Sequence, residues 1–183
     1  MSLKRNTSRI GEALANAPLV MPRSLRAQVK ELGGVKAVAD TVGRSVSSVY
    51  RWLRGVNKPS SEAKGALDQA TRTLHGSQGY RRGKLRAGRE KRFRTKGARV
   101  TIHGMAGPAI DSPAVTVKYR RINNYLLSAT GMNEILDAWL TQGDEAALEA
   151  LKDAMAIDYL ALQAPDIADE GWTIETIDLI KFT

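Results

Sequence analysis

The sequence predicts an α+β protein with three parts: an N-terminal all-α helix-turn-helix domain (residues 1–75), a basic arm (76–99) and a small C-terminal β-β-α-α-β domain (100–183). Apolar residues before residue 75 recur every three or four positions, which is the period of an amphipathic helix. Ten of the 20 residues at 80–99 are Lys or Arg. After residue 100, segments of alternating β type flank two further helical patterns.

The N-terminal domain is expected to contain four helices after a short amphipathic segment at residues 10–17. The helical spacing of apolar residues covers residues 23–32, 35–42, 45–54 and 63–74. Glycines and prolines separate these stretches, and Ser60 begins a run that can cap the last of them.

Residues 35–54 have the spacing of a DNA-binding helix-turn-helix. Ala39 supplies the small residue where the helices cross, Gly43 supplies a turn residue tolerant of positive φ, and Val49 supplies a branched apolar residue in the second helix. The other positions expected to face the core are Val38, Val42, Val46 and Trp52. An ordinary helical hairpin with a glycine turn is the alternative.

The outward side of the second helix and its flanks carries short hydroxyls and cations, which suit base edges and phosphates. The residues predicted to contact DNA here are Arg44, Ser45, Ser47, Ser48, Arg51, Arg54 and Lys58. Tyr50 fits either the rim of this surface or the cover of the core.

The basic arm has three glycines at residues 80–99 and no wide apolar face, so disorder or partial helix is expected when it is isolated. It is predicted to follow phosphates, with Tyr80 and Phe93 available for base stacking. A solvated tail is the alternative. The cations of the arm predicted to contact DNA are Arg81, Arg82, Lys84, Arg86, Arg89, Lys91, Arg92, Arg94 and Lys96.

The C-terminal domain is expected to begin with a strand at residues 100–103 and a loop at 104–113 that contains Gly and Pro. A second strand is predicted at 115–122, with its extension to Leu127 left open. One helix begins at Thr130 and ends at Gly143, and the next, capped by Asp144, has an apolar face that reaches Tyr159. An acidic loop at 166–171, expected to be exposed rather than metal-binding, precedes a last strand at 172–182.

The net charge of +9 is distributed unevenly. Residues 1–79 hold 13 basic and 5 acidic residues, residues 80–99 hold 10 basic residues and one Glu, and residues 100–183 hold 5 basic and 13 acidic residues. This pattern favours nucleic acid as a partner of the first 99 residues. The alternative is that the acidic part folds back onto the basic arm.

The sequence excludes several classes of protein. With no cysteine and two histidines, disulfide scaffolds, thiolate catalysis and zinc fingers are ruled out, and no metal site is expected. No phosphate-binding loop and no catalytic serine–histidine pattern is found, so neither a cofactor nor an enzyme activity is predicted. Without a signal peptide or an apolar run of roughly 18 residues, the chain is expected to have no membrane partner and to lie in the cytoplasm with the nucleoid.

The order of segments resembles the terminal proteins of linear actinomycete (Streptomyces-type) chromosomes and plasmids. The resemblance rests on AQVKELGGVKAVADTVGRSVSSVYRWL, the basic run, GARVTIHG, KYRRINNYL, EILDAWLTQGDEAALEALKDAMAIDYL and WTIETIDLIKF. It implies that the chain becomes covalently joined to DNA 5′ ends and primes the synthesis that fills the telomere. Its partners would be duplex and single-stranded DNA ends, a telomere-associated protein and a DNA polymerase, for which the chain is substrate and scaffold rather than enzyme.

The resemblance also implies a hydroxyl that accepts the first nucleotide in the loop before the second strand, at residues 108–116. Ser112 is the first candidate, because it lies between Asp111 and Pro113 in a stretch whose glycines and prolines prevent regular strand pairing, and Thr116 is the second. The alternative is that Asp111-Ser112-Pro113 is only a polar turn. The alternative function is a helix-turn-helix transcriptional regulator of plasmid or phage type, whose C-terminal domain forms a homodimer. A partition or conjugation accessory protein is a third.

Overall fold

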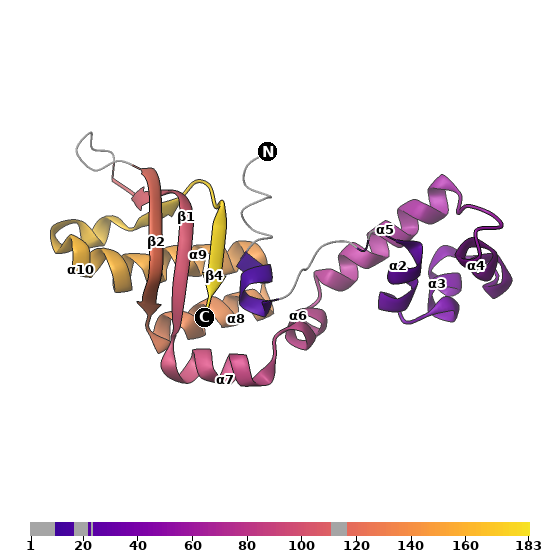
Figure 1. Ribbon diagram of the computed structural model, residues 1–183, viewed down its shortest axis with the longest axis horizontal. Coiled ribbons are helices and arrows are strands. Elements are labelled where there is room, and N and C mark those ends of the chain that lie inside the picture. Colours follow the sequence, from indigo (N-terminus) through magenta and orange to yellow (C-terminus); the bar gives the residue numbers. More distant parts are fainter. Residues whose placement is uncertain (1–9, 17–21, 23, 111–116) are drawn as a thin grey trace. The chain divides into compact units, whose positions relative to one another are not determined.

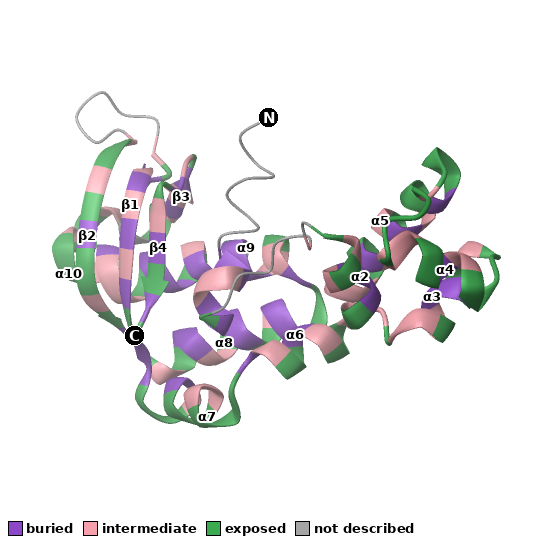
Figure 2. Ribbon diagram, turned by 45° about the vertical axis from the view of Figure 1, so that its right-hand side comes forward, coloured by how far each residue is buried: buried purple, intermediate pink, exposed green. Residues whose placement is uncertain are grey.

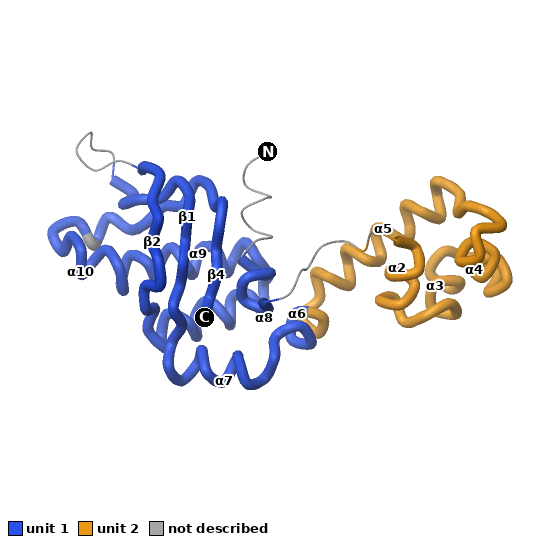
Figure 3. The backbone as a smooth tube through the Cα atoms, viewed as in Figure 1, with its two compact units in different colours: residues 1–19, 81–183 blue, residues 20–80 orange. Residues whose placement is uncertain are grey.

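The computed structural model describes residues 10–16, 22, 24–110 and 117–183, which form an α+β protein with a four-stranded antiparallel sheet (Figure 1). The chain divides into two compact units, which we call unit 1 (residues 1–19 and 81–183) and unit 2 (residues 20–80; Figure 3). The boundaries differ from those expected. The basic segment at 81–96 belongs to the same unit as the sheet, and so does the helical stretch at residues 10–15.

Unit 2 contains four described helices from residue 24 on, and serine side chains cap the starts of three of them. Its helices are α2 (Leu25–Glu31), α3 (Val35–Val42), α4 (Val46–Leu53) and α5 (Ser61–His75). Ser24, Ser45 and Ser60 each accept a hydrogen bond from a backbone N–H three residues further on, which satisfies a donor that the helix itself leaves unpaired. The core that these helices enclose consists of Val29, Val38, Ala39, Val49 and Leu67.

The turn between α3 and α4 depends on Gly43, which lies in the left-handed region at φ 61° and ψ 38°. Its N–H bonds back to the carbonyls of Ala39 and Asp40, and the N–H of Arg44 also bonds to Ala39. This closes α3 and lets α4 begin three residues later.

Gly43→Val is expected to destabilise unit 2 by about 1–3 kcal/mol, because a β-branched residue is strained at a positive φ. No atom lies within 4 Å of an added Cβ, so the loss comes from the backbone and not from a clash. Gly43→Asn, which tolerates this conformation better, is the matched control and should lose clearly less. Thermal unfolding followed by circular dichroism measures the difference, and equal losses for the two variants would contradict the assignment.

The sheet of unit 1 is built around β1 (Ala98–Pro108). β2 (Lys118–Leu127) pairs antiparallel along one edge of β1, and β3 (Trp172–Ile174) and β4 (Leu179–Phe182) pair antiparallel along the other. The expectation of a loop from residue 104 is wrong for 104–108, which continue the strand. Gly104 permits this because the carbonyl of Thr176 approaches its Cα, and a side chain there would collide with it.

The last predicted strand, at residues 172–182, is interrupted in the structure. Residues 175–178 leave the ladder between β3 and β4 while the N–H groups of Glu175 and Asp178 still bond to the carbonyls of Met105 and His103. The two short strands therefore form one broken edge beside β1.

Two helices, α8 (Ala129–Thr141) and α9 (Asp144–Met155), pack against one face of the sheet (Figure 1). Their buried sides, purple in Figure 2, contribute Ile135, Trp139 and Leu151 to a core that also contains Ile10 and Leu14. After α9 the chain continues as η1 (Ala156–Leu160), α10 (Ala161–Gln163) and η2 (Pro165–Glu170). No described helix combines the length and the apolar character that crossing a membrane requires.

The predicted cap of α9 is corrected by one residue. Gly143, at φ 106°, is the cap, and Asp144 is the first helical residue. The carboxylate of Asp144 accepts a hydrogen bond from Trp139 Nε1 (2.7 Å). Burial raises the pKa of Asp144 above its ordinary value, against the opposing effects of this hydrogen bond and of Arg81.

Asp144→Asn is expected to make the protein more stable near neutral pH and to leave its stability unchanged in acid. A raised pKa in the folded state means that the group contributes stability below its unfolded pKa and loses it as the pH rises through the folded pKa. The amide keeps an oxygen for Trp139 without the buried charge. Urea unfolding at several pH values measures this, with Asp153→Asn, an exposed position on the same helix, as control. A difference that does not shrink in acid would contradict the account.

Candidate nucleic-acid interface

One side of α4 faces solvent and the other covers the core of unit 2. Val49 is fully buried, and Trp52 and Leu53 pack against the same core, as expected for Trp52. The predicted contact residues that the structure places in solvent are Arg44, Ser45, Ser47, Arg51, Arg54 and Lys58. Ser48 is half-buried.

Two of the hydroxyls predicted to contact DNA form hydrogen bonds at the start of α4. The Ser45 Oγ accepts a hydrogen bond from the N–H of Ser48 (3.2 Å) and also bonds to the Ser48 Oγ (2.9 Å). These two side chains fix the first turn of the helix, whereas Ser47, between them, lies on the exposed side.

The exposed side of α4 is more apolar than predicted. Val46, expected in the core, is 41% exposed, and Tyr50, for which two positions were open, is 48% exposed. At 100° per residue, Ser47, Arg51 and Arg54 lie about 140–160° from Val49, whereas Val46 and Tyr50 lie about 60° and 100° from it, at the margin between the exposed and the buried side. Only the exposure of Val46 was missed, because this apolar residue lies within about 60° of the buried Val49 and was therefore assigned to the core. We call Val46, Ser47, Tyr50, Arg51 and Arg54 the α4 surface.

The segment of sequence that contains this surface carries only positive charges between Asp40 and Glu62. Residues 41–61 contain three arginines and a lysine and no acidic residue. A helix with two arginines on its solvent side and no neighbouring carboxylate in sequence has the electrostatics of a phosphate- or base-contacting surface.

The basic segment is helical in the whole chain, whereas the expectation of disorder or partial helix concerned the segment in isolation. It forms α6 (Gln78–Lys84) and α7 (Ala87–Lys96), and two apolar side chains, Leu85 and Phe93, are buried in the core of unit 1. Base stacking by Phe93 is therefore wrong, since its side chain is fully buried. Tyr80 is half-buried and stacks on His75 of α5, with ring centroids 4.3 Å apart.

Three arginines of this segment bond within the chain. Arg81 is 7% exposed and donates to the Leu140 carbonyl (3.2 Å), so its predicted DNA contact is wrong. Arg89 donates to the carbonyls of Leu14, Ala13 and Phe182. Arg94 bonds to Glu90, Asn133 and Asp137, and the hydrogen bond with Asp137 does most to raise its pKa. Apart from Glu90, these partners lie 39 or more residues away in sequence, which is why composition alone assigned these arginines to DNA.

The other predicted cations of the segment reach solvent. Those that the structure exposes are Arg82, Arg86, Lys91, Arg92 and Lys96. Lys84 is half-buried.

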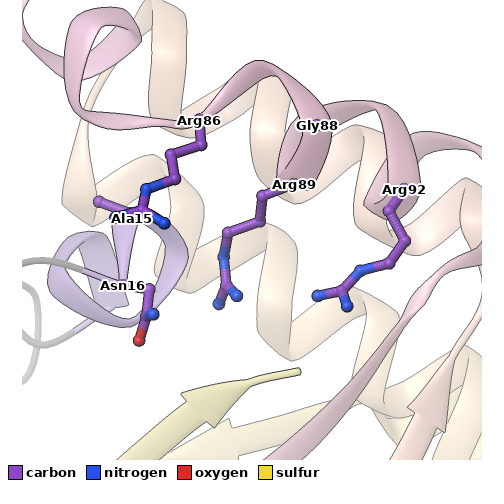
Figure 4. A pocket seen from close by; sticks show the side chains of 6 residues that line it. All are labelled: Ala15, Asn16, Arg86, Gly88, Arg89 and Arg92. Carbon is purple, nitrogen blue, oxygen red and sulfur yellow. The ribbon is translucent and has the colours of Figure 1, made fainter.

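Arg86, Arg89 and Arg92 line a pocket of about 240 Å³ together with Ala15, Asn16 and Gly88 (Figure 4). The guanidinium carbons of Arg89 and Arg92 lie 4.5 and 5.2 Å from the centroid of the Phe93 ring. Burial lowers the pKa of Arg89, and the charge of Arg92 lowers it further. Neither arginine has a carboxylate within 4.0 Å among the described residues, so the pocket has the charge to hold an anion such as a phosphate.

The two candidate priming hydroxyls, Ser112 and Thr116, lie outside the described residues. The strands on either side are described: β1 ends at Pro108 and β2 begins at Lys118. Ser112 and Thr116 thus belong to the connection between two antiparallel strands.

No family model, no curated protein and no solved structure matches the chain. In the described part of the chain, no group of three or more His, Cys, Asp or Glu could hold a metal ion. The resemblance to terminal proteins therefore stays a prediction, and function has to be inferred from the surfaces described above.

Proposed function

We propose that this chain is a DNA-binding protein that inserts α4 into the major groove of duplex DNA. The observation that carries the proposal is the α4 surface, where Arg51 and Arg54 reach solvent on a helix anchored from behind by Val49. The absence of acidic residues from 41–61 supports it, because a phosphate backbone repels carboxylates.

The size of a helix suits this role. An α-helix with its side chains is about 10–12 Å across, and a B-DNA major groove is about 12 Å wide, so the groove admits α4. Arginine pairs with the O6 and N7 atoms of guanine, and apolar side chains contact the thymine methyl group. Arg51 and Arg54 supply the first kind of contact, and Val46 and Tyr50 supply the second.

The exposed cations of α6 and α7 contribute affinity without sequence preference. Arg82, Arg86, Lys91 and Arg92 neutralise phosphates, and the pocket between Arg86 and Arg92 receives one phosphate group. Such contacts position a protein on DNA and do not discriminate between bases.

We propose further that the bound DNA is the end of a linear molecule, for which this chain provides the priming hydroxyl. The support is the resemblance stated above, together with the position of residues 109–117 between two long strands. The hydroxyl oxygen would form a bond to the α-phosphorus of a deoxynucleoside triphosphate, its proton would pass to solvent and pyrophosphate would leave. A separate DNA polymerase would supply the metal ions for this step.

Duplex binding is tested with Arg51→Ala and Arg54→Ala, singly and together. If each side chain reads a base, each substitution costs about 1–3 kcal/mol of binding free energy and relaxes the preferred sequence. The duplex is one selected by the wild-type protein from a random library, and fluorescence anisotropy measures affinity at several salt concentrations.

The matched control is Arg82→Gln with Lys91→Gln, which removes the same charge from exposed positions of α6 and α7. This pair should lower the slope of log affinity against log salt by about 1.8, at roughly 0.9 per phosphate, and leave the preferred sequence unchanged. Wild-type affinity and sequence preference in the Arg51→Ala, Arg54→Ala double variant would refute the placement of α4.

A further inference from the structure

From residue 98 to the end of unit 1, the charges are segregated between the strands and the rest of the chain. Residues 100–183 hold 13 acidic and 5 basic residues, yet no Asp or Glu occurs in any of the four described strands. The strands instead carry five cations: Arg99, Lys118, Arg120, Arg121 and Lys181. The acidic residues occupy the helical layer and the connections, of which Glu175 and Asp178 lie nearest the sheet.

Most of these cations lie on the face of the sheet opposite α8 and α9. Along β1, buried residues alternate with Arg99, Thr101, His103 and Met105, which are half-buried or exposed. Lys118 and Arg120 are the exceptions, because they are paired with Ala106 and Gly104 of the buried set. Arg120 also donates to the Ala106 carbonyl (2.9 Å) and lies over the Trp172 ring.

The strand register brings residues of β2, β1 and β4 together on this face of the sheet. His103 of β1 is paired with Arg121 of β2 on one side and with Leu179 of β4 on the other. Thr101 is paired with Lys181, and Arg99 with Leu126. We call the exposed cations Arg99, Arg121 and Lys181, with Tyr119, His103 and Met105, the open sheet face.

Tyr119 gives this face an aromatic platform. It is 48% exposed, lies opposite Met105 on the neighbouring strand, and has the Arg121 guanidinium carbon 6.0 Å from its ring centroid. Beside it, His103 Nε2 bonds to Asn123 Oδ1 (2.8 Å), which holds a second ring on the same face.

We propose that the open sheet face binds a single strand of DNA, with a base stacked on Tyr119 and phosphates held by Arg121 and Lys181. The charge excludes a cationic partner, and a stacking ring between cations is the arrangement that binds single strands without sequence preference. A duplex fits less well, because its bases are already stacked. With strands about 4.8 Å apart, β2 to β4 spans about 10 Å, a width over which comparable sheets stack two or three bases. The proposal is independent of duplex binding by α4.

The test uses the full chain carrying Arg51→Ala and Arg54→Ala, so that the α4 surface contributes little. Binding of a fluorescein-labelled oligothymidylate is followed by anisotropy. Tyr119→Ala should weaken binding roughly tenfold, because one stacked base is lost, whereas Tyr119→Phe should bind as the parent does. Leu162→Ala, which removes a 75% exposed side chain from α10, is the matched control and should change nothing.

A second pair of variants tests the phosphate contacts. Arg121→Gln with Lys181→Gln should lower the slope of log affinity against log salt by about 1.4, at roughly 0.7 per phosphate of a single strand, whereas Lys152→Gln on α9 should not. Equal binding of oligothymidylate by the Tyr119→Ala and Tyr119→Phe variants would overturn the proposal. An unchanged salt slope in the Arg121→Gln, Lys181→Gln variant would also overturn it. So would a dimer, detected by light scattering, in which the open sheet face binds the acidic helices of a second copy of the chain. Duplex binding of the Tyr119 variants in the otherwise wild-type chain should be unaltered, which separates this proposal from that for α4.

Discussion

Phe93→Ala is expected to lower the free energy of unfolding of unit 1 by about 3–5 kcal/mol, the range found for large aromatic truncations in protein cores. The Phe93 ring is fully buried, lies 6.4 Å from the Phe182 ring and is flanked by the guanidiniums of Arg89 and Arg92. Its removal takes away the apolar anchor that holds α7 on the sheet. A flexible basic arm would instead give a loss within about 0.5 kcal/mol, as at ordinary surface positions.

Urea unfolding followed by tryptophan fluorescence measures this loss, because Trp139 and Trp172 belong to the same core. Lys91→Ala, two residues away and exposed, is the control and should stay within about 0.5 kcal/mol of wild type. Equal stabilities of the Phe93→Ala and Lys91→Ala variants would show that the basic segment is not part of the core.

The second large effect concerns priming. With template, labelled deoxynucleotide and host polymerase extract, the wild-type chain is expected to acquire a covalent nucleotide, and the Ser112→Ala, Thr116→Ala double variant is expected to acquire none. The reason is chemical: alanine has no hydroxyl oxygen to form the bond to the α-phosphorus. Mass mapping of the labelled peptide identifies the residue.

Thr101→Ala is the matched control for labelling, because it removes a hydroxyl from β1 while residues 111–116 stay unchanged. It should be labelled as the wild-type chain is. Label on a peptide outside residues 100–119, or undiminished labelling of the double variant, would end the assignment to Ser112 or Thr116. No label with an active extract would favour the transcriptional regulator instead.

The helices of unit 2 could be predicted from sequence because their signals are local. Serine caps, glycine turns and a three- to four-residue apolar period all act within a few positions, so α3, the Gly43 turn and α4 were found with nearly the correct ends. The helices of the basic segment could not be predicted from such local signals. Its helices are held by two widely spaced apolar residues, Leu85 and Phe93, which give no recognisable period.

The errors in unit 1 come from contacts between distant parts of the chain. Gly104 indicated a loop, but it lies within β1. The position requires glycine because the backbone of Thr176 passes too close for a side chain. Arg81 and Arg89 indicated phosphate contacts, but their donors meet carbonyls some 59 to 93 residues away. The cations of the strands escaped notice for a related reason, since the acidic helices dominate the net charge of residues 100–183.

The most direct measurement of the central claim is photo-cross-linking of the full chain to a selected duplex in which 5-iododeoxyuridine replaces thymidine, followed by mass mapping. Because Val46 and Tyr50 lie exposed beside Arg51 and Arg54, we expect the main cross-link within residues 46–54, at Tyr50. It should disappear in the Arg51→Ala, Arg54→Ala double variant. Cross-links confined to residues 81–183, unchanged in that variant, would contradict insertion of α4 into the duplex.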